Sequence, residues 1–316
     1  MDTHSFVLGT MNICYPYSSN YQSNYNEYQQ IIQTYIDNVG SNAILDTAYY
    51  YGNTKTEKIL GEILPTLSLQ PKISTKVNPW YQNDFTNNQL GQLNTEGINK
   101  QLSTSLTSLQ QEQVDILYLH CYDYETPIQE TLEICNTLWR KEKFLSFGLS
   151  NFSLLQVKEV IDEIDKEEYA PIKYYQGMYN LISRKVEEIF PLLDEYSIEF
   201  WGYNPLAGGL LTGKYKNYEN TKDIRESSRF KDNSIYQNIF WKPEIINNLQ
   251  DFFELENSTE YSLQWIGHHS KMKKNDKVIM GVSTLQQFNQ NVKYIKEKKQ
   301  LKLYSFDFSY SPNYWY

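Results

Sequence analysis

The chain has 316 residues, of which 40% are hydrophobic and 21% are charged, so it can bury a sizeable core and is not a disordered protein. Its formal net charge of −9 and its pI near 5.1 argue against general binding to nucleic acid or to an anionic membrane, because both require a basic face. An anionic cofactor would have to be held by local basic residues and backbone N–H groups.

The N-terminus and the cysteines indicate a reduced protein of the cytoplasm. Met1–His4 is not part of a basic segment followed by an apolar one, and no apolar run approaches the ~20 residues that span a bilayer. Cys14, Cys121 and Cys135 are odd in number and show no CxxC spacing. We therefore expect no disulfide framework, no metal site and no membrane partner.

Short apolar runs alternate with amphipathic segments along the chain, which predicts alternating strands and helices. The helical period is plainest after Ser153, where Val157, Val160, Ile161 and Ile164 share one stripe. The expected strands are Phe6–Gly9, Ala43–Asp46, Lys72–Lys76, Ile116–His120, Phe144–Ser150, Ile172–Gln176, Ile198–Asn204 and Lys277–Met280. The expected helices are Asn26–Val39, Thr54–Leu64, Gly97–Leu109, Ile128–Glu142, Leu154–Lys166, Arg184–Tyr196, Thr259–His269 and Leu285–Lys298.

Eight strand–helix units with short connections predict an α/β fold, a closed (β/α)8 TIM barrel that forms a single domain over residues 1–316. No Gly/Ser/Pro-rich linker divides the chain. One long irregular stretch, residues 205–258, separates the seventh strand from its helix, and its interior, Asn217–Asn233, is polar. A connection of that length in a compact fold is typical of functional loops or of disordered segments.

Three ionisable residues end three consecutive expected strands. Asp46 ends Ala-Ile-Leu-Asp, Lys76 ends Lys-Ile-Ser-Thr-Lys, and His120 ends Ile-Leu-Tyr-Leu-His. Tyr51 follows Asp46 by five residues. Each residue alone has a structural explanation, such as capping a turn. Together they are expected to converge, because the active sites of TIM barrels lie at the C-terminal ends of the strands.

The chemistry of these four residues fits general acid catalysis. A lysine ammonium close to a phenol stabilises the phenolate and lowers the tyrosine pKa from its usual ~10. An aspartate paired with the lysine holds it in place, and a neutral histidine can donate a hydrogen bond to a carbonyl oxygen. None of these groups can supply a hydride, so a cofactor must do so.

Ordered motifs over nearly the whole chain resemble one enzyme family. They begin at Val7–Met11 and include Leu45–Ala48 with Tyr51, Glu57–Gly61, Asp115–His120, Phe147–Asn151, Tyr175–Asn180 and Asn204–Tyr215. On these residues the chain resembles the aldo-keto reductases, and especially the aflatoxin-aldehyde reductase branch. The resemblance implies an NADPH-dependent (NADP+-dependent) enzyme that reduces small-molecule aldehydes, or ketones, to alcohols.

The resemblance also implies catalytic roles. Tyr51 matches the proton donor, and Asp46, Lys76 and His120 complete its tetrad. The run Tyr49–Tyr51 offers more than one tyrosine, but the spacing from the aspartate favours the last of the three. A homodimer is compatible with the resemblance, although nothing in the sequence marks an interface.

For the cofactor, Ser150, Asn151 and Gln176 match positions that hydrogen-bond the nicotinamide carboxamide, and Tyr203 matches the aromatic residue that stacks on its ring. Small residues in 206–214 let backbone N–H groups approach the pyrophosphate, and the start of the last helix favours phosphate. The long 205–258 loop would then lie over the cofactor. Arg229 resembles a contact to the 2′-phosphate, which favours NADPH over NADH. The other expected contacts are Asn204, Leu206, Gly208, Leu210, Lys214, Gly281, Ser283, Gln287 and Asn291.

Other functions remain open at this point. A nucleotide-binding, redox-sensing or channel-accessory protein on the same fold would have little turnover, since fold does not fix function. A barrel isomerase or aldolase would use Lys76 to form a Schiff base. Gly208–Lys214 copies most of a P-loop, but Tyr215 stands where magnesium ligation needs Ser or Thr, which argues against an NTPase.

Overall fold

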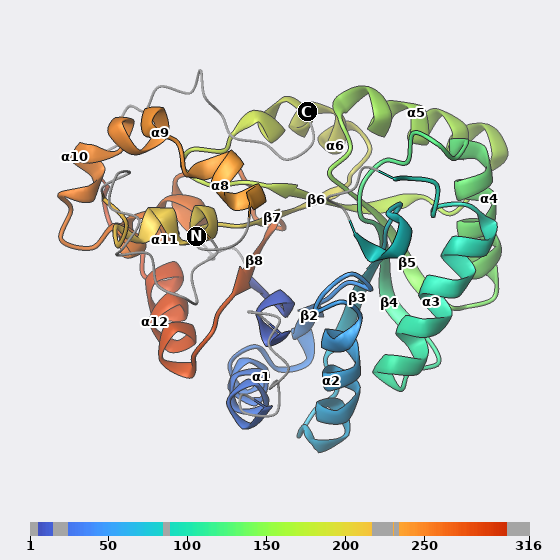
Figure 1. Ribbon diagram of the computed structural model, residues 1–316, viewed down its shortest axis with the longest axis horizontal. Helices are drawn as coiled ribbons and strands as arrows, with labels where there is room; N and C mark the ends of the chain where they lie inside the picture. Colours follow the sequence, from blue (N-terminus) through green and yellow to red (C-terminus); the bar gives the residue numbers. More distant parts are fainter. Residues whose placement is uncertain (1–5, 15–24, 85–88, 217–229, 231–233, 302–316) are drawn as a thin grey trace.

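The computed structural model describes residues 6–14, 25–84, 89–216, 230 and 234–301. The described strands close into a parallel barrel in chain order, in which β1 pairs with both β2 and β8 (Figure 1). This confirms the predicted (β/α)8 fold. The strands are β1 (Phe6–Gly9), β2 (Ile44–Asp46), β3 (Lys72–Val77), β4 (Val114–Leu119), β5 (Phe144–Ser150), β6 (Ile172–Met178), β7 (Glu199–Tyr203) and β8 (Lys277–Gly281).

Helices alternate with these strands and cover the outside of the barrel, where their apolar stripes form the larger part of the core. They are α1 (Tyr25–Val39), α2 (Lys55–Ile63), α3 (Thr95–Leu109), α4 (Ile128–Arg140), α5 (Leu154–Glu167), α6 (Phe190–Glu195), α11 (Ser258–His268) and α12 (Leu285–Lys296). Among the described residues, no helix combines the length and the apolar character that crossing a membrane requires.

The sixth expected helix, Arg184–Tyr196, is shorter than its pattern suggested. A 3-10 turn covers Lys185–Glu188, and α6 begins only at Phe190, with Pro191 in its first turn. Proline has no backbone N–H and clashes with the preceding turn, so it is tolerated at the start of a helix and not inside one. The helix therefore begins at this proline rather than running through it.

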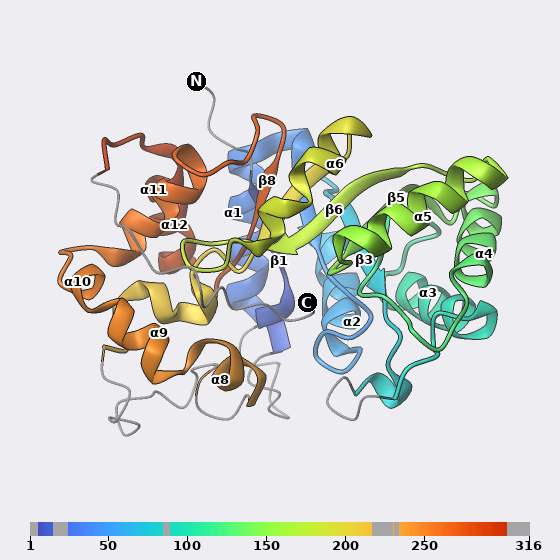
Figure 2. The same cartoon turned by 90° about the horizontal axis from the view of Figure 1, so that it is seen from above.

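The stretch that follows β7 was expected to be irregular, but it contains regular elements. It contains a 3-10 segment, η7 (Ala207–Thr212), and three short helices, α8 (Ser234–Phe240), α9 (Pro243–Asn248) and α10 (Gln250–Phe253). Figure 2 shows these helices grouped with α11 and α12, on the side of the barrel away from α3 and α4. Each helix is too short to display a clear period in the sequence. α8 and α10 bury aromatic side chains, whereas α9 buries Ile245 and Ile246. Most of Asn217–Asn233 lies outside the described residues.

The inside of the barrel is filled by its own layer of side chains. Tyr118 and Trp201 are fully buried there, with ring centroids 6.0 Å apart. Gly148 pairs with Tyr118 across β4 and β5, and a Cβ at that glycine would lie 2.4 Å from the Tyr118 ring. The glycine therefore makes room for the ring, which forms a floor beneath the C-terminal ends of the strands.

Candidate active site

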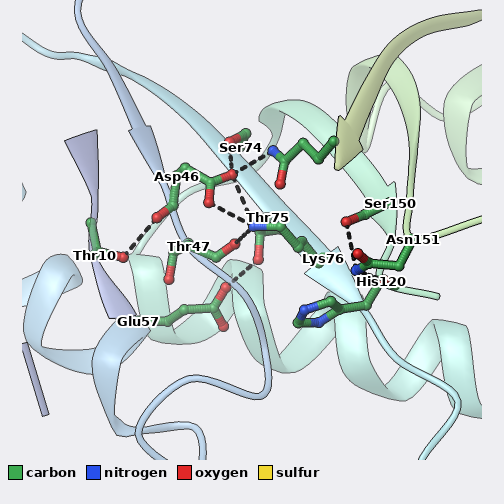
Figure 3. Close-up of polar contacts among 11 residues, drawn as sticks. Thr10, Asp46, Thr47, Glu57, Ser74, Thr75, Lys76, His120, Ser150 and Asn151 are labelled. Carbon is green, nitrogen blue, oxygen red and sulfur yellow. Dashed lines mark hydrogen bonds and ion pairs between the residues drawn. The ribbon is translucent and has the colours of Figure 1, made fainter. Parts of the chain in front are cut away.

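The barrel brings the three predicted strand-end residues to the same rim. Asp46 is the last residue of β2, Lys76 is the penultimate residue of β3, and His120 directly follows β4. Parallel pairing sets Lys76 opposite Tyr118 on the neighbouring strand, two positions below the level of His120. All three side chains lie near one another at the C-terminal end of the barrel (Figure 3).

Lys76 and Asp46 form a buried ion pair. The Lys76 Nζ lies 2.8 Å and 2.7 Å from the two carboxylate oxygens of Asp46 and also donates to the Thr47 carbonyl at 2.8 Å. Both charged side chains are 2% exposed. Burial lowers the pKa of Lys76 from its usual value, and the charge of Asp46 opposes that shift. The ammonium is therefore held in one position.

Further donors fix the Asp46 carboxylate. Its Oδ1 accepts hydrogen bonds from Ser74 Oγ at 2.9 Å and from Gln176 Nε2 at 2.7 Å. Gln176 comes from β6, on a distant part of the barrel wall, so the carboxylate links β2, β3 and β6. A buried charge is tolerated when it is paired and hydrogen-bonded in this way.

Tyr51 lies in the turn between β2 and α2, beside this ion pair. The Lys76 Nζ is 5.1 Å from the centroid of the Tyr51 ring, and the His120 ring centroid is 6.0 Å from it. The neighbouring Tyr50 ring stacks edge-on against Trp80 at 5.2 Å. The Lys76 ammonium therefore lies beside the Tyr51 ring.

His120 is neutral and faces aromatic rings. Burial, and to a smaller extent the charge of Lys76, holds the pKa of His120 well below its usual range. The ring centroids of Trp80 and Tyr50 lie 5.1 Å and 6.4 Å from that of His120. Its Nδ1 is buried and has no hydrogen-bond partner among the described residues. A neutral imidazole beside Tyr51 can orient a carbonyl oxygen by hydrogen bonding.

The residues expected to hold the nicotinamide gather next to His120. Asn151 donates from Nδ2 to the His120 carbonyl and to Ser150 Oγ, both at 3.0 Å, and accepts from the Tyr203 hydroxyl at 2.7 Å. Gln176 donates to the Asp46 carboxylate, as described above. The side chains of Ser150, Asn151 and Tyr203 are thus hydrogen-bonded to one another. Amide and hydroxyl groups of this kind are the donors and acceptors that a carboxamide needs.

The predicted pyrophosphate segment is the glycine-containing turn η7. Gly208 has φ +67° and Gly209 has φ +103°, a region that favours glycine. The Asn204 Oδ1 accepts from the Gly208 N–H at 2.8 Å, and a Cβ at Gly208 would lie 2.4 Å from the Tyr236 ring of α8. A Cβ at Gly209 would meet nothing within 4 Å. One side of the turn is therefore packed and the other is open.

Other predicted contacts differ in how accessible they are. Lys214 is exposed and Leu206 is partly exposed, whereas the Leu210 side chain is fully buried, so only the backbone of Leu210 could meet a phosphate. Arg229, the expected contact to the 2′-phosphate, lies outside the described residues.

At the start of α12, Gly281, Ser283 and Gln287 are exposed. The Gln287 Oε1 accepts from the Ser283 N–H at 3.0 Å, and Thr284 caps the helix by accepting from the Gln287 N–H. Asn291 is 7% exposed, so it lies on the buried side of α12 while Gln287 faces outward. The two expected contacts therefore differ in accessibility.

The sequence alone did not assign roles to several residues that adjoin the site. Tyr118 lies beneath the ion pair, with the Lys76 Nζ 5.8 Å from its ring centroid. Ser74 contacts Asp46, and Glu57 is a buried carboxyl behind β3. Tyr118 and Ser74 each lie two residues before a predicted site residue on the same strand, and this alternation could have identified them. The described His, Cys, Asp and Glu residues form no group of three or more suited to a metal ion.

Comparison with known proteins agrees with the fold. The model of the aldo/keto reductase family matches residues 5–307. Human aflatoxin B1 aldehyde reductase member 2 is 38% identical over 271 residues, which cover 80% of this chain and 73% of that protein. Human aldo-keto reductase family 7 member A3 is 36% identical over 271 residues, covering 80% and 79%.

Solved structures share the fold at lower identity. A glycerol dehydrogenase from Gluconobacter oxydans superposes with a TM-score of 0.73 at 22% identity and covers 95% of this chain and 91% of its own. An aldo/keto reductase from Klebsiella pneumoniae, in complex with NADP and acetate, has a TM-score of 0.63 at 18% identity, with 94% and 87% coverage. With the family match and the sequence relatives, the conclusion is plain: the chain belongs to the aldo/keto reductase family.

Proposed function

We propose that the protein is an NADPH-dependent reductase that converts aldehydes, and ketones as a second class, to alcohols, with Tyr51 as the general acid. Its family acts on small-molecule carbonyl compounds with nicotinamide cofactors. The observation that carries the finer proposal is the position of the Tyr51 ring, 5.1 Å from a lysine ammonium and next to a neutral histidine.

Each residue of the tetrad has a role that follows from its contacts. Lys76 stabilises the phenolate that Tyr51 becomes when it gives its proton to the carbonyl oxygen. Asp46 holds Lys76 in place and offsets its charge. His120 directs the carbonyl oxygen toward the tyrosine by donating a hydrogen bond. The four groups act only when they are close together, so the barrel rim is the part of the fold on which activity depends.

The cofactor would supply the hydride to the carbonyl carbon. The residues present fit such a group, because Ser150 and Asn151 provide hydroxyl and amide groups beside His120, Gln176 provides an amide beside Asp46, and the Gly209 side of η7 is open to an approaching phosphate. The exposed Lys214 adds a positive charge near that turn. NADPH rather than NADH is proposed on the strength of Arg229, and the ratio of the two dissociation constants tests it.

The Lys76 contacts argue against Schiff-base chemistry. A nucleophilic lysine must be deprotonated and free to attack, whereas the Lys76 Nζ is held by both oxygens of Asp46 and by a carbonyl. An ammonium in this position can act electrostatically without forming a covalent bond to the substrate.

The test compares the wild type with Tyr51→Phe, and follows NADPH oxidation by absorbance with 4-nitrobenzaldehyde as substrate. We expect kcat to fall by about 10²-fold or more, because the proton donor is lost. The affinity for NADPH, measured by fluorescence titration, should stay within about threefold. Tyr50→Phe, which alters the neighbouring ring, is the control and should keep most of its activity. A wild type that binds NADPH but turns over none of a broad panel of carbonyls would favour a nucleotide-sensing protein instead.

A further inference from the structure

A second carboxyl group lies behind the catalytic lysine, outside the tetrad. Glu57, in the first turn of α2, is 1% exposed. Its carboxyl accepts a short hydrogen bond from the hydroxyl of Thr75, the residue that directly precedes Lys76 on β3. Figure 3 shows this contact beside the Lys76–Asp46 pair. Because side chains alternate along a strand, Thr75 points to α2 while Lys76 points into the barrel.

The charges at this rim nearly cancel when Glu57 is neutral. Lys76 carries one positive charge and Asp46 one negative charge. In the proposed reaction Tyr51 becomes a phenolate, so the rim gains a negative charge that Lys76 must stabilise. An ionised Glu57 would add another negative charge in a buried region, where screening is weak. It would compete with the phenolate for the field of the same ammonium.

The surroundings of Glu57 favour its protonated form at moderate pH. Burial raises the pKa of Glu57 from its usual value to about 7, although the Thr75 hydrogen bond and the charge of Lys76 lower it. Among the described residues, the titratable groups whose charges act on it are Lys76, from β3, and Tyr49, from the turn after β2. α3 contributes the uncharged Ser105. Burial raises the pKa of Tyr49, so that phenol stays neutral near pH 7.

We propose that Glu57 is a positioning residue of the reaction: its carboxyl holds Thr75, and thereby the segment of β3 that carries Lys76, and its ionisation places a negative charge near Lys76 that weakens the acid function of Tyr51. This inference rests on the proposed reductase. It assigns a pH-dependent control of the rate to a residue that contacts neither substrate nor cofactor. His120 cannot account for the same control near pH 7, because its pKa lies well below the usual range.

The first experiment measures kcat against pH for the wild type and for Glu57→Gln, with an uncharged aldehyde and saturating NADPH. The wild-type kcat should fall about tenfold as the pH rises through about 7, because one pKa unit in the acid corresponds to about a tenfold change. Glu57→Gln cannot ionise, so its profile should be flat over this range. An inflection that survives in Glu57→Gln would overturn the role of Glu57.

Thr75→Val provides a matched variant that keeps Glu57. It preserves the side-chain shape but removes the donated hydrogen bond, which stabilises the ionised carboxylate. The pKa of Glu57 should therefore rise, and the inflection in kcat should move upward by about one pH unit. An inflection that moves downward or stays in place would contradict the proposal.

A second readout does not require turnover. A carboxyl whose pKa is higher in the folded than in the unfolded protein binds more protons when folded, so stability is greatest below the unfolded pKa and falls as the pH rises toward about 7. The Tm of the wild type should therefore fall relative to that of Glu57→Gln between about pH 5 and about pH 8. If this difference appears while the wild type reduces no carbonyl, the proposed function fails and Glu57 remains a buried protonated carboxyl. An active wild type with a pH-independent Tm difference would overturn the inference on Glu57 alone.

Discussion

The ends of β2, β3 and β4 differ from the connection between β7 and β8 in the forces that shape them. At the strand ends, charged and polar side chains hold one another: Lys76 contacts Asp46 at 2.7 Å and 2.8 Å, and Gln176 reaches the same carboxylate from β6. In the β7–β8 connection, aromatic rings hold the backbone. Phe230 lies 5.4 Å from Trp241 and 6.4 Å from Tyr236, measured between ring centroids.

The two regions therefore have different expected roles in the proposed site. The polar region depends on strand register, because parallel pairing alone brings Asp46, Lys76 and His120 to one rim. The aromatic region depends on shape, because the Tyr236 ring occupies the space that a side chain at Gly208 would need. A substitution in the first region should act mainly on chemistry, and one in the second mainly on cofactor binding.

The largest effect should follow from breaking the ion pair. Lys76→Met leaves the buried Asp46 without its cation, which should lower the free energy of unfolding by about 3–5 kcal/mol and kcat by about 10²-fold or more. Urea denaturation and steady-state kinetics measure the two. The double variant Asp46→Asn/Lys76→Met carries no unpaired charge and should recover much of the stability but none of the activity. A single variant as stable as the wild type would contradict the tight pairing.

In the aromatic region, the adjacent glycines of η7 form a matched pair. Both have positive φ, but only a Cβ at Gly208 would collide with Tyr236. Gly208→Ala should therefore cost about 1–3 kcal/mol of packing on top of backbone strain, and should weaken NADPH binding, as measured by fluorescence titration. Tyr236→Leu should relieve the defect of Gly208→Ala and leave that of Gly209→Ala unchanged. Rescue at neither glycine would show that backbone strain, and not the ring, sets the cost.

The substitution with the smallest expected effect lies where the two regions meet. Tyr203→Phe removes the hydroxyl that donates to Asn151 Oδ1 at 2.7 Å and keeps the ring that is expected to stack on the nicotinamide. Loss of this bond should weaken NADPH binding by about 0.5–1.5 kcal/mol, that is, by roughly two- to tenfold in Kd. The Kd measured by titration checks this, with kcat expected to change less. Tighter binding would mean that the hydroxyl competes with the cofactor for Asn151.

Strand ends could be predicted from the sequence more reliably than the elements of the β7–β8 connection. A buried strand is a continuous apolar run, and Phe6–Gly9 and Phe144–Ser150 begin and end where expected. In contrast, α9 and α10 span six and four residues, which is less than two helical turns, so their sequence carries no readable period. They are held by burial: α9 buries Ile245 and Ile246, and Phe252 of α10 packs against Tyr261 of α11.

The sequence by itself determined the alternation of strands and helices, the barrel, and the residues at its rim, because these follow from apolar periodicity and from short motifs. The tertiary structure alone decided which groups touch: that Gln176 reaches Asp46 across 130 residues, that Tyr118 fills the space beside Gly148, and that Glu57 is buried behind Lys76. Hydrogen bonds and burial depend on distances that chain closure sets. The sequence cannot distinguish a carboxyl exposed on a helix surface from one that is buried near a lysine, as Glu57 is near Lys76. Only tertiary packing decides between the two environments.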